Sequence, residues 1–100
     1  MTVRWHPDAL AEAAAAARFY RDKRQGLAQR FLNCLEEAVH RVELHPHIYR
    51  EVEPGIRKCR VETFPYALIF RTGPDVQIVA VMHLRRQPGY WKERTRGLTN

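Results

Sequence analysis

Residues 56–84 read IRKCRVETFPYALIFRTGPDVQIVAVMHL, and this stretch decides the fold. It contains three runs that are typical of β-strands: IRKCRVE (56–62), YALIFRT (66–72) and VQIVAVMHL (76–84). In the first run Cys59 and Val61 alternate with charged residues, which is the period of a strand with one buried face. Because a Phe-Pro corner and a Gly-Pro-Asp turn separate the runs, we expect consecutive strands that pair in antiparallel fashion.

Upstream of this stretch the apolar period changes from two residues to about 3.6. Pro7 suits the first turn of a helix and Asp8 suits the positive end of its dipole. Strong helix formers follow as far as Arg24. The apolar face of this helix is predicted to consist of Leu10, Ala13, Ala14, Ala17 and Tyr20. Its alanines imply that another element approaches closely.

A second helix is predicted directly after Gly26, which tolerates the backbone of a helix end. One apolar stripe contains Leu27, Phe31, Leu35, Ala38 and Val42, widened by Leu32 and Val39, and Pro46 ends the pattern. Two amphipathic helices joined by so short a loop form an antiparallel αα-hairpin.

Together with a short opening strand at Thr2–Trp5, the predicted order is β-α-α-β-β-β. The hairpin must bury its stripe against one face of the sheet, which gives a two-layer α+β fold with a mainly antiparallel four-stranded sheet. The opening strand is expected to join along the last strand. One hundred residues correspond to a single domain, residues 1–100.

The formal net charge of +6 is unevenly distributed. Residues 1–45 hold seven Lys/Arg and six Asp/Glu, whereas residues 46–100 hold ten and five, so the halves contribute +1 and +5. A positive field favours a nucleic acid or an acidic protein as partner, although it also serves solubility alone.

No apolar run approaches the ~20 residues that cross a bilayer, and the N-terminus lacks the apolar core of a signal peptide. We therefore expect a cytoplasmic protein that makes no use of a membrane. Cys34 and Cys59 show no paired spacing, and His45 and His47 have no carboxylate or thiolate at ligand spacing. The sequence predicts reduced core cysteines, no metal site and no cofactor.

Basic residues mark the strands and the chain that follows them. They are Arg57, Lys58 and Arg60 in the first run, Arg71 at the end of the second, and Arg85 and Arg86 after His83. If the strand register gathers them, they form a cationic groove for phosphate or for an acidic partner. Tyr66, Tyr90 and Trp91 would then offer stacking surfaces for single-stranded RNA. Alternatively, the Pro88-Gly89 turn folds Tyr90 and Trp91 back onto the core.

Such a groove could cleave RNA without a metal. His83 has an ordinary pKa near 6.5 and could accept or donate the proton, while the cations hold the charge that grows on the phosphate. A surface cluster without catalysis explains the same residues.

The passages HPHIYREVEPGIRKCRVETFPYALIF (45–70) and VMHLRRQPGYWKER (81–94), with the Pro-led helix and the Gly26-Leu27 helix start, resemble the RelE/ParE superfamily. These are the toxins of bacterial type II toxin-antitoxin (plasmid stabilisation) modules. The resemblance covers nearly the whole chain and is most specific from Gly55 to Phe70. It implies a growth-inhibiting toxin that is neutralised by a small acidic antitoxin, whose disordered segment would fold onto the toxin.

The resemblance leaves two targets open. Members similar to RelE cut mRNA on the ribosome, and those similar to ParE poison DNA gyrase without acting as nucleases. RNA-cutting members tend to carry an arginine just after the aromatic residue that opens the third strand, where this chain has Ala67 after Tyr66. That departure favours the ParE-like reading.

The leading hypothesis is therefore a ParE-like toxin with no catalytic residue and no small-molecule substrate, which uses Arg85, Arg86, Tyr90 and Trp91 as its effector surface. Phosphate or an acidic partner would be bound by Arg57, Lys58, Arg60 and Arg71. The alternative is a metal-free mRNA endonuclease with His83, Arg86 and Tyr90 as catalytic residues. A non-toxic member that only binds its antitoxin is a third possibility.

Overall fold

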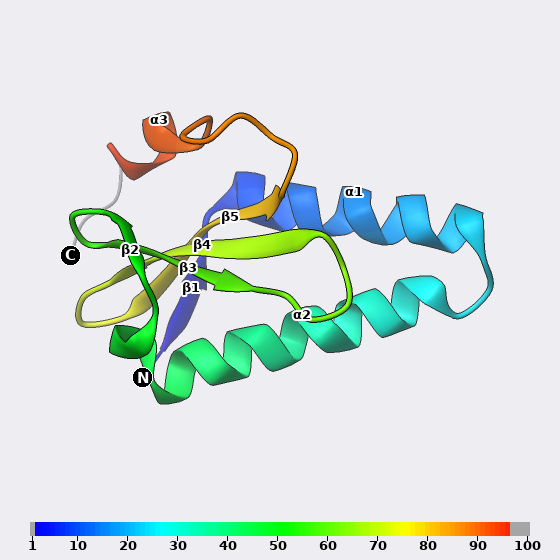
Figure 1. The fold of residues 1–100 in the computed structure, drawn as a ribbon, viewed down its shortest axis with the longest axis horizontal. Coiled ribbons are helices and arrows are strands. Elements are labelled where there is room, and N and C mark those ends of the chain that lie inside the picture. The colour runs from blue at the N-terminus through cyan, green and yellow to red at the C-terminus, as the bar shows by residue number, and fades with distance from the viewer. Residues whose placement is uncertain (1, 97–100) are drawn as a thin grey trace.

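The computed structural model describes residues 2–96, and Figure 1 shows their arrangement. In chain order the elements are β1 (Val3–Trp5), α1 (Pro7–Lys23), α2 (Leu27–Leu44), the short 3-10 helix η1 (Pro46–Ile48), β2 (Glu51–Glu53), β3 (Ile56–Arg60), β4 (Tyr66–Thr72), β5 (Val76–His83) and α3 (Lys92–Thr95). The predicted α+β fold is confirmed. The two long helices lie side by side as an antiparallel hairpin, and α3 lies across the sheet from α2 (Figure 1).

The strand order in the sheet is β1-β5-β4-β3-β2. The first strand runs parallel to β5, with Val3 opposite Val76, and the other neighbours are antiparallel. The predicted place of the opening strand along the last strand is thus confirmed. The predicted four-stranded sheet is wrong, because β2 adds a fifth strand at the edge. Its Glu-Val-Glu sequence is three residues long and pairs in an irregular register, so it lacks the apolar alternation by which a strand is recognised.

The helices cover one face of the sheet, called the inner face below. An aromatic cluster fills the space between them and the strands. The ring of Phe31 is fully buried and lies 5.2–5.4 Å from the ring centroids of Tyr20, Phe64 and Tyr66, in tilted or edge-to-face arrangements. Such aromatic contacts stabilise beyond the apolar area that they bury. The cluster joins α1, α2 and the chain entering β4.

The first helix packs through alanines, as its composition indicates, but along a different line from the predicted one. Ala9, Ala13 and Ala16 are buried, whereas Leu10 is 53% exposed and Ala14 is exposed. The small side chains let α1 approach β5 closely. A stripe that includes the large Leu10 would hold the two elements further apart.

The face of the sheet opposite α1 and α2, called the outer face below, is covered by the segment that follows β5. Trp91 is 3% exposed and packs against Ile69 and Met82 of that face. The turn before it requires Gly89, which has a positive φ of 84°. A Cβ at this position would also come within 2.8 Å of the Lys92 side chain. Glycine therefore permits the turn that directs Trp91 onto the sheet.

No helix in the described part of the chain is both long and apolar enough to cross a membrane.

Replacing Phe31 by alanine is expected to lower the free energy of unfolding by about 3–5 kcal/mol, since it removes a fully buried ring from the aromatic cluster. The adjacent Leu32 is 39% exposed, so Leu32→Ala should cost less than about 1 kcal/mol. Urea denaturation of both variants measures the difference. Equal losses would contradict the proposed role of the cluster.

Candidate functional site

A pocket of about 520 Å³ opens on the outer face of the sheet and is called the outer pocket below. Strands β2 to β5 supply part of its lining and the segment after β5 supplies the rest. Its lining residues are Arg50, Glu51, Val52, Lys58, Ile69, Met82, Leu84, Arg86, Pro88, Gly89 and Trp91. The lining thus combines mostly buried apolar residues with three cationic side chains and the carboxylate of Glu51.

The strand register brings Lys58 to this pocket. Lys58 lies opposite Ile69 across the β3–β4 pair, and directly opposed side chains of antiparallel strands share a face. By the same rule Arg60, opposite Ala67, and Arg71, opposite Ile56, also lie on the outer face. Arg71 donates a hydrogen bond to the Thr95 carbonyl (3.4 Å), which ties β4 to α3. Lys58 and Arg86 are therefore the predicted cations that share the pocket.

Arg57 lies on the inner face. Its guanidinium donates to the carbonyls of Tyr49 (2.6 Å) and His47 (3.3 Å), and its side chain is only 18% exposed. These contacts hold the loop after α2 against β3. Arg57 is separated from Lys58 by the thickness of the sheet.

His83 also lies on the inner face. Its ring meets the ring of Tyr66 edge-on, with centroids 5.0 Å apart, and its Nδ1 accepts a hydrogen bond from the Arg85 backbone N–H (3.0 Å). It lines a smaller pocket of about 240 Å³ together with Glu12 and Phe19 of α1. Arg86 borders both pockets, but His83 and Lys58 face opposite sides of the sheet.

The aromatic side chains of the segment after β5 are engaged inside the protein. The Tyr90 hydroxyl donates to Glu12 Oε2 (2.7 Å), and the guanidinium carbons of Arg86 and Arg94 lie over its ring at 3.8 and 5.2 Å. Trp91 is buried beneath the pocket. Arg85 is exposed at the end of β5. Of the four predicted effector residues, the two arginines present their side chains to solvent.

A hydrogen-bonded ion pair holds this segment in place. The Arg94 guanidinium donates to both carboxylate oxygens of Glu12 at 2.8 Å. Glu12 also accepts from the Val81 backbone N–H (3.0 Å), while Arg94 donates to the Val79 carbonyl (3.1 Å). We call the contacts among Glu12, Tyr90, Arg94 and this edge of β5 the edge lock.

The edge lock occupies the place where β1 ends. The last pair in that ladder is Trp5 with Ile78, so the edge of β5 beyond Ile78 has no neighbouring strand. Glu12 and Arg94 satisfy the backbone groups that β1 leaves unpaired. Sequence analysis missed both residues, which lie 82 positions apart. The one available signal was a carboxylate, Glu12, with alanine on both sides in an alanine-rich helix.

The edge lock changes the proton affinity of its members. Burial by itself would raise the pKa of Glu12, but the hydrogen bonds from Arg94, Tyr90 and Val81 and the charge of Arg94 outweigh it. The pKa of Glu12 therefore lies below its ordinary value of 4.5. Burial and the neighbouring carboxylate raise the pKa of Tyr90, so its hydroxyl remains a donor.

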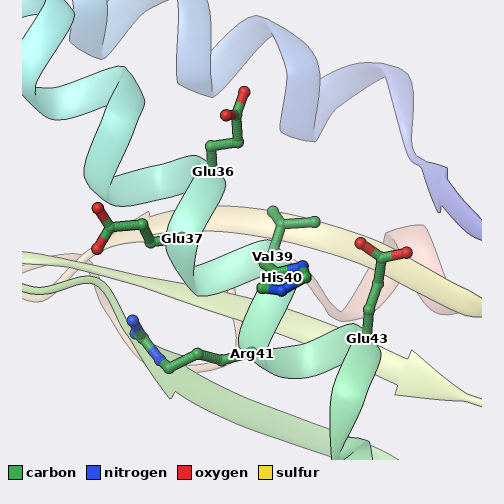
Figure 2. Close-up of a pocket in the computed structure, with 6 residues that line it drawn as sticks. All are labelled: Glu36, Glu37, Val39, His40, Arg41 and Glu43. Atoms are coloured by element: carbon green, nitrogen blue, oxygen red, sulfur yellow. The ribbon is translucent and has the colours of Figure 1, made fainter.

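Another concavity, of about 540 Å³, lies along α2 and is lined by Glu36, Glu37, Val39, His40, Arg41 and Glu43. Figure 2 shows that these side chains all leave one helix and spread in different directions. Arg41 is engaged with the Arg60 carbonyl (3.0 Å) and with Glu62 (3.6 Å). Since nothing there converges on a ligand, the outer pocket is the better candidate site. Within the described residues, no group of three or more His, Cys, Asp or Glu side chains could hold a metal ion.

Residues 3–88 match the family described as ParE toxin of type II toxin-antitoxin system, parDE. Among solved structures, the fold is similar to a chain described as the chromosomal ParDE TA system from P. aeruginosa, with a TM-score of 0.60 and 21% sequence identity. That similarity covers 83% of this chain and 95% of the other. No curated protein sequence matches.

Because of the edge lock, the free energy of unfolding is expected to depend on pH. Because the pKa of Glu12 is lower in the folded protein than in the unfolded chain, its contribution is complete above about pH 4.5 and is lost as pH falls through the folded value. At pH 7, Glu12→Gln should lower the free energy of unfolding by about 1–3 kcal/mol. The difference from the unmodified protein should shrink below pH 4.5. Denaturation curves at several pH values measure it.

Asp22→Asn is the matched control, because this carboxylate is 74% exposed on the same helix. Its effect at pH 7 should stay within about 0.5 kcal/mol. A Glu12→Gln penalty that is equally small, or that grows towards acid, would contradict the role assigned to the edge lock.

Proposed function

The chain belongs to the ParE toxin family of type II toxin-antitoxin systems, and from that premise we propose that it arrests growth by binding and poisoning DNA gyrase. It acts through protein contacts, without catalysis and without a cofactor. Arg85 and Arg86 are the side chains that meet the target, and Tyr90 and Trp91 hold them from below. A cognate acidic antitoxin neutralises it in the cytoplasm, in a module that stabilises the replicon carrying it.

One observation carries this proposal beyond the family match. The segment after β5 leaves Arg85 and Arg86 in solvent, while its aromatic rings are engaged with the protein itself. Exposed arginines at the mouth of a pocket are typical of protein-binding surfaces, where Arg is frequent among the residues that dominate affinity. The basic C-terminal half also suits an acidic antitoxin.

The second candidate function is cleavage of mRNA on the ribosome. The shared pocket of Lys58 and Arg86 supports it, since both could contact phosphate. Three features argue against it. His83 faces the opposite side of the sheet from Lys58, Ala67 offers no cation, and the Tyr90 ring is already covered by guanidinium groups. A non-toxic protein that only binds its antitoxin would need none of these groups.

The Arg85→Ala, Arg86→Ala double variant is expected to weaken inhibition of gyrase about tenfold or more, because truncating an arginine anchor of an interface costs on the order of 2 kcal/mol. A supercoiling assay with detection of trapped, cleaved DNA measures this effect, and relief of growth arrest should accompany it. Arg18→Ala, Arg30→Ala removes the same charge from exposed helix positions and should change neither readout.

Assays of the same protein also distinguish the gyrase proposal from the endonuclease and from the non-toxic member. Cut mRNA in a translation reaction, abolished by His83→Ala, would replace the gyrase proposal with the endonuclease. Expression of the chain without its antitoxin and without growth arrest would favour the non-toxic member.

A further inference from the structure

The smaller pocket beside α1 offers the free aromatic ring that the outer pocket lacks, and it is called the α1 pocket below. Its volume is about 240 Å³, and its lining comes from α1, from Tyr66 of β4, from the end of β5 and from Arg86. We propose that it binds one unpaired nucleotide, whose base enters the pocket against Phe19 and whose phosphate meets Arg86. No reaction follows the binding, and this ligand is distinct from the protein contact of the gyrase proposal.

Two small side chains on α1 open a slot beside an aromatic ring. Ala15 and Ala16 line the α1 pocket, and Phe19 follows one turn later. Long side chains on a helix lean towards the preceding turn, which directs Phe19 towards these alanines. The Phe19 ring is 52% exposed, and the Lys23 ammonium, 4.9 Å from its centroid, comes from the following turn. The side of the ring towards the alanines is therefore open to a planar ligand.

The end of β5 adds a backbone donor and acceptor beside this slot. The Leu84 N–H donates to the Pro65 carbonyl, so Leu84 directs its backbone groups towards β4. Val81 and His83 alternate with it and direct theirs to the opposite side, where the Val81 N–H reaches Glu12. The Val81 carbonyl and the His83 N–H thus point to the edge of β5 that faces α1. Nucleobase edges carry donors and acceptors in one plane, which suits such a pair.

The His83 side chain presents a further donor. Its Nδ1 accepts the Arg85 backbone N–H at 3.0 Å, so the neutral ring carries its proton on Nε2. The ring lines the α1 pocket and meets the Tyr66 ring edge-on, with centroids 5.0 Å apart. The Nε2–H lies away from the Arg85 contact and can donate to an oxygen or nitrogen of a bound nucleotide.

Positive charge at the rim suits the phosphate. Arg86 lines the α1 pocket, and within residues 2–96 no carboxylate lies at ion-pair distance from it. The Tyr90 ring supports this side chain, with its centroid 3.8 Å from the guanidinium carbon. The carboxylate in the lining, Glu12, has each oxygen 2.8 Å from the Arg94 guanidinium, so its charge is paired. The free guanidinium therefore favours a phosphate, to which arginine donates two parallel hydrogen bonds.

The size of the α1 pocket limits its occupant. Ligand pockets usually measure roughly 300–1,000 Å³, and this one is smaller, at about 240 Å³. One base fits the slot while its sugar and phosphate remain at the rim, whereas a base pair is too wide. An exposed ring for stacking together with an arginine for phosphate is the combination by which proteins bind unpaired nucleotides.

The test is a titration of the purified full chain with AMP, followed by NMR. The backbone amides of Ala16, Phe19, Val81 and His83 should shift. Phe19→Ala should weaken binding about tenfold, because a stacking ring is removed, whereas Phe19→Tyr keeps the ring and should retain binding. Leu44→Ala is the matched control, since Leu44 is 58% exposed on α2 and lies outside the pocket. It should change affinity less than about twofold.

Fragments of the ligand separate the base from the charge. Adenosine and ribose phosphate should each bind more weakly than AMP. Arg86→Gln should weaken AMP binding about tenfold and leave adenosine binding unchanged, because it removes charge-assisted hydrogen bonds to the phosphate. Ribose phosphate that binds as tightly as AMP, equal losses in Phe19→Ala and Leu44→Ala, or no shifts with AMP would each overturn the inference. Unchanged spectra away from each substitution confirm that the variants fold.

Such a nucleotide has two sources, the free pool and a single strand. Hexaadenylate that binds these amides more tightly than AMP at equal nucleotide concentration would identify the strand as the source, and equal or weaker binding would identify the free nucleotide. Both results keep the site. The titration contains no gyrase, so absent AMP shifts in a chain that inhibits gyrase would discard the nucleotide site alone, and AMP binding by a chain that leaves gyrase unaffected would discard the gyrase target alone.

Discussion

The ion pair between Glu12 and Arg94 is the contact on which the candidate site depends. It lies where β1 stops beside β5, so that the backbone of Val79 and Val81 has no neighbouring strand on that side. Buried charges are costly unless each is paired and hydrogen-bonded, and here each group supplies what the other lacks. The pair fixes the end of the described chain against α1. Trp91, three residues earlier, is thereby held on the outer face as the base of the outer pocket.

This arrangement divides the basic residues between two faces of the sheet. Lys58 and Arg86 meet at the outer pocket, whereas Arg57 and His83 lie on the helix side and make internal contacts. Two aromatic residues hold the segment after β5 against the rest of the protein. Tyr90 does so through its hydroxyl and Trp91 through its buried ring. What the outer pocket presents is mainly the positive charge of Arg50, Lys58 and Arg86. Because the Tyr90 and Trp91 rings are engaged by the protein, this pocket offers no free aromatic face on which a nucleic acid base could stack.

Much of the fold was predictable because its signals are local. These signals each act over a few residues: the alternation in residues 56–84, the apolar stripe around Phe31, and the helix boundaries at Pro7, Gly26 and Pro46. The three-residue strand β2 was missed because its Glu-Val-Glu sequence owes its structure to pairing with β3. Leu10 was placed in the core because an alanine-rich helix has several faces of similar hydrophobicity.

The site was predictable only in part, because it depends on register and on contacts between distant residues. The basic positions were recognised, but a one-residue change in register moves a side chain to the other face, which separates Arg57 from Lys58. Glu12 and Arg94 are 82 positions apart in the sequence, so no local sequence pattern indicates that they pair. Whether Tyr90 and Trp91 stack on a ligand or fold back onto the core also depends on contacts with distant residues. Only the packing in the structure shows which of the two each ring does.

Hydrogen exchange of the Glu12→Gln variant, followed by NMR or mass spectrometry, tests most directly whether this ion pair holds the segment that builds the outer pocket. We expect exchange of the Val81 amide and of amides in residues 89–96 to accelerate about tenfold or more relative to the unmodified chain, while amides at the centre of β4 change much less. Uniform acceleration throughout the sheet, or unchanged protection of residues 89–96, would contradict the account.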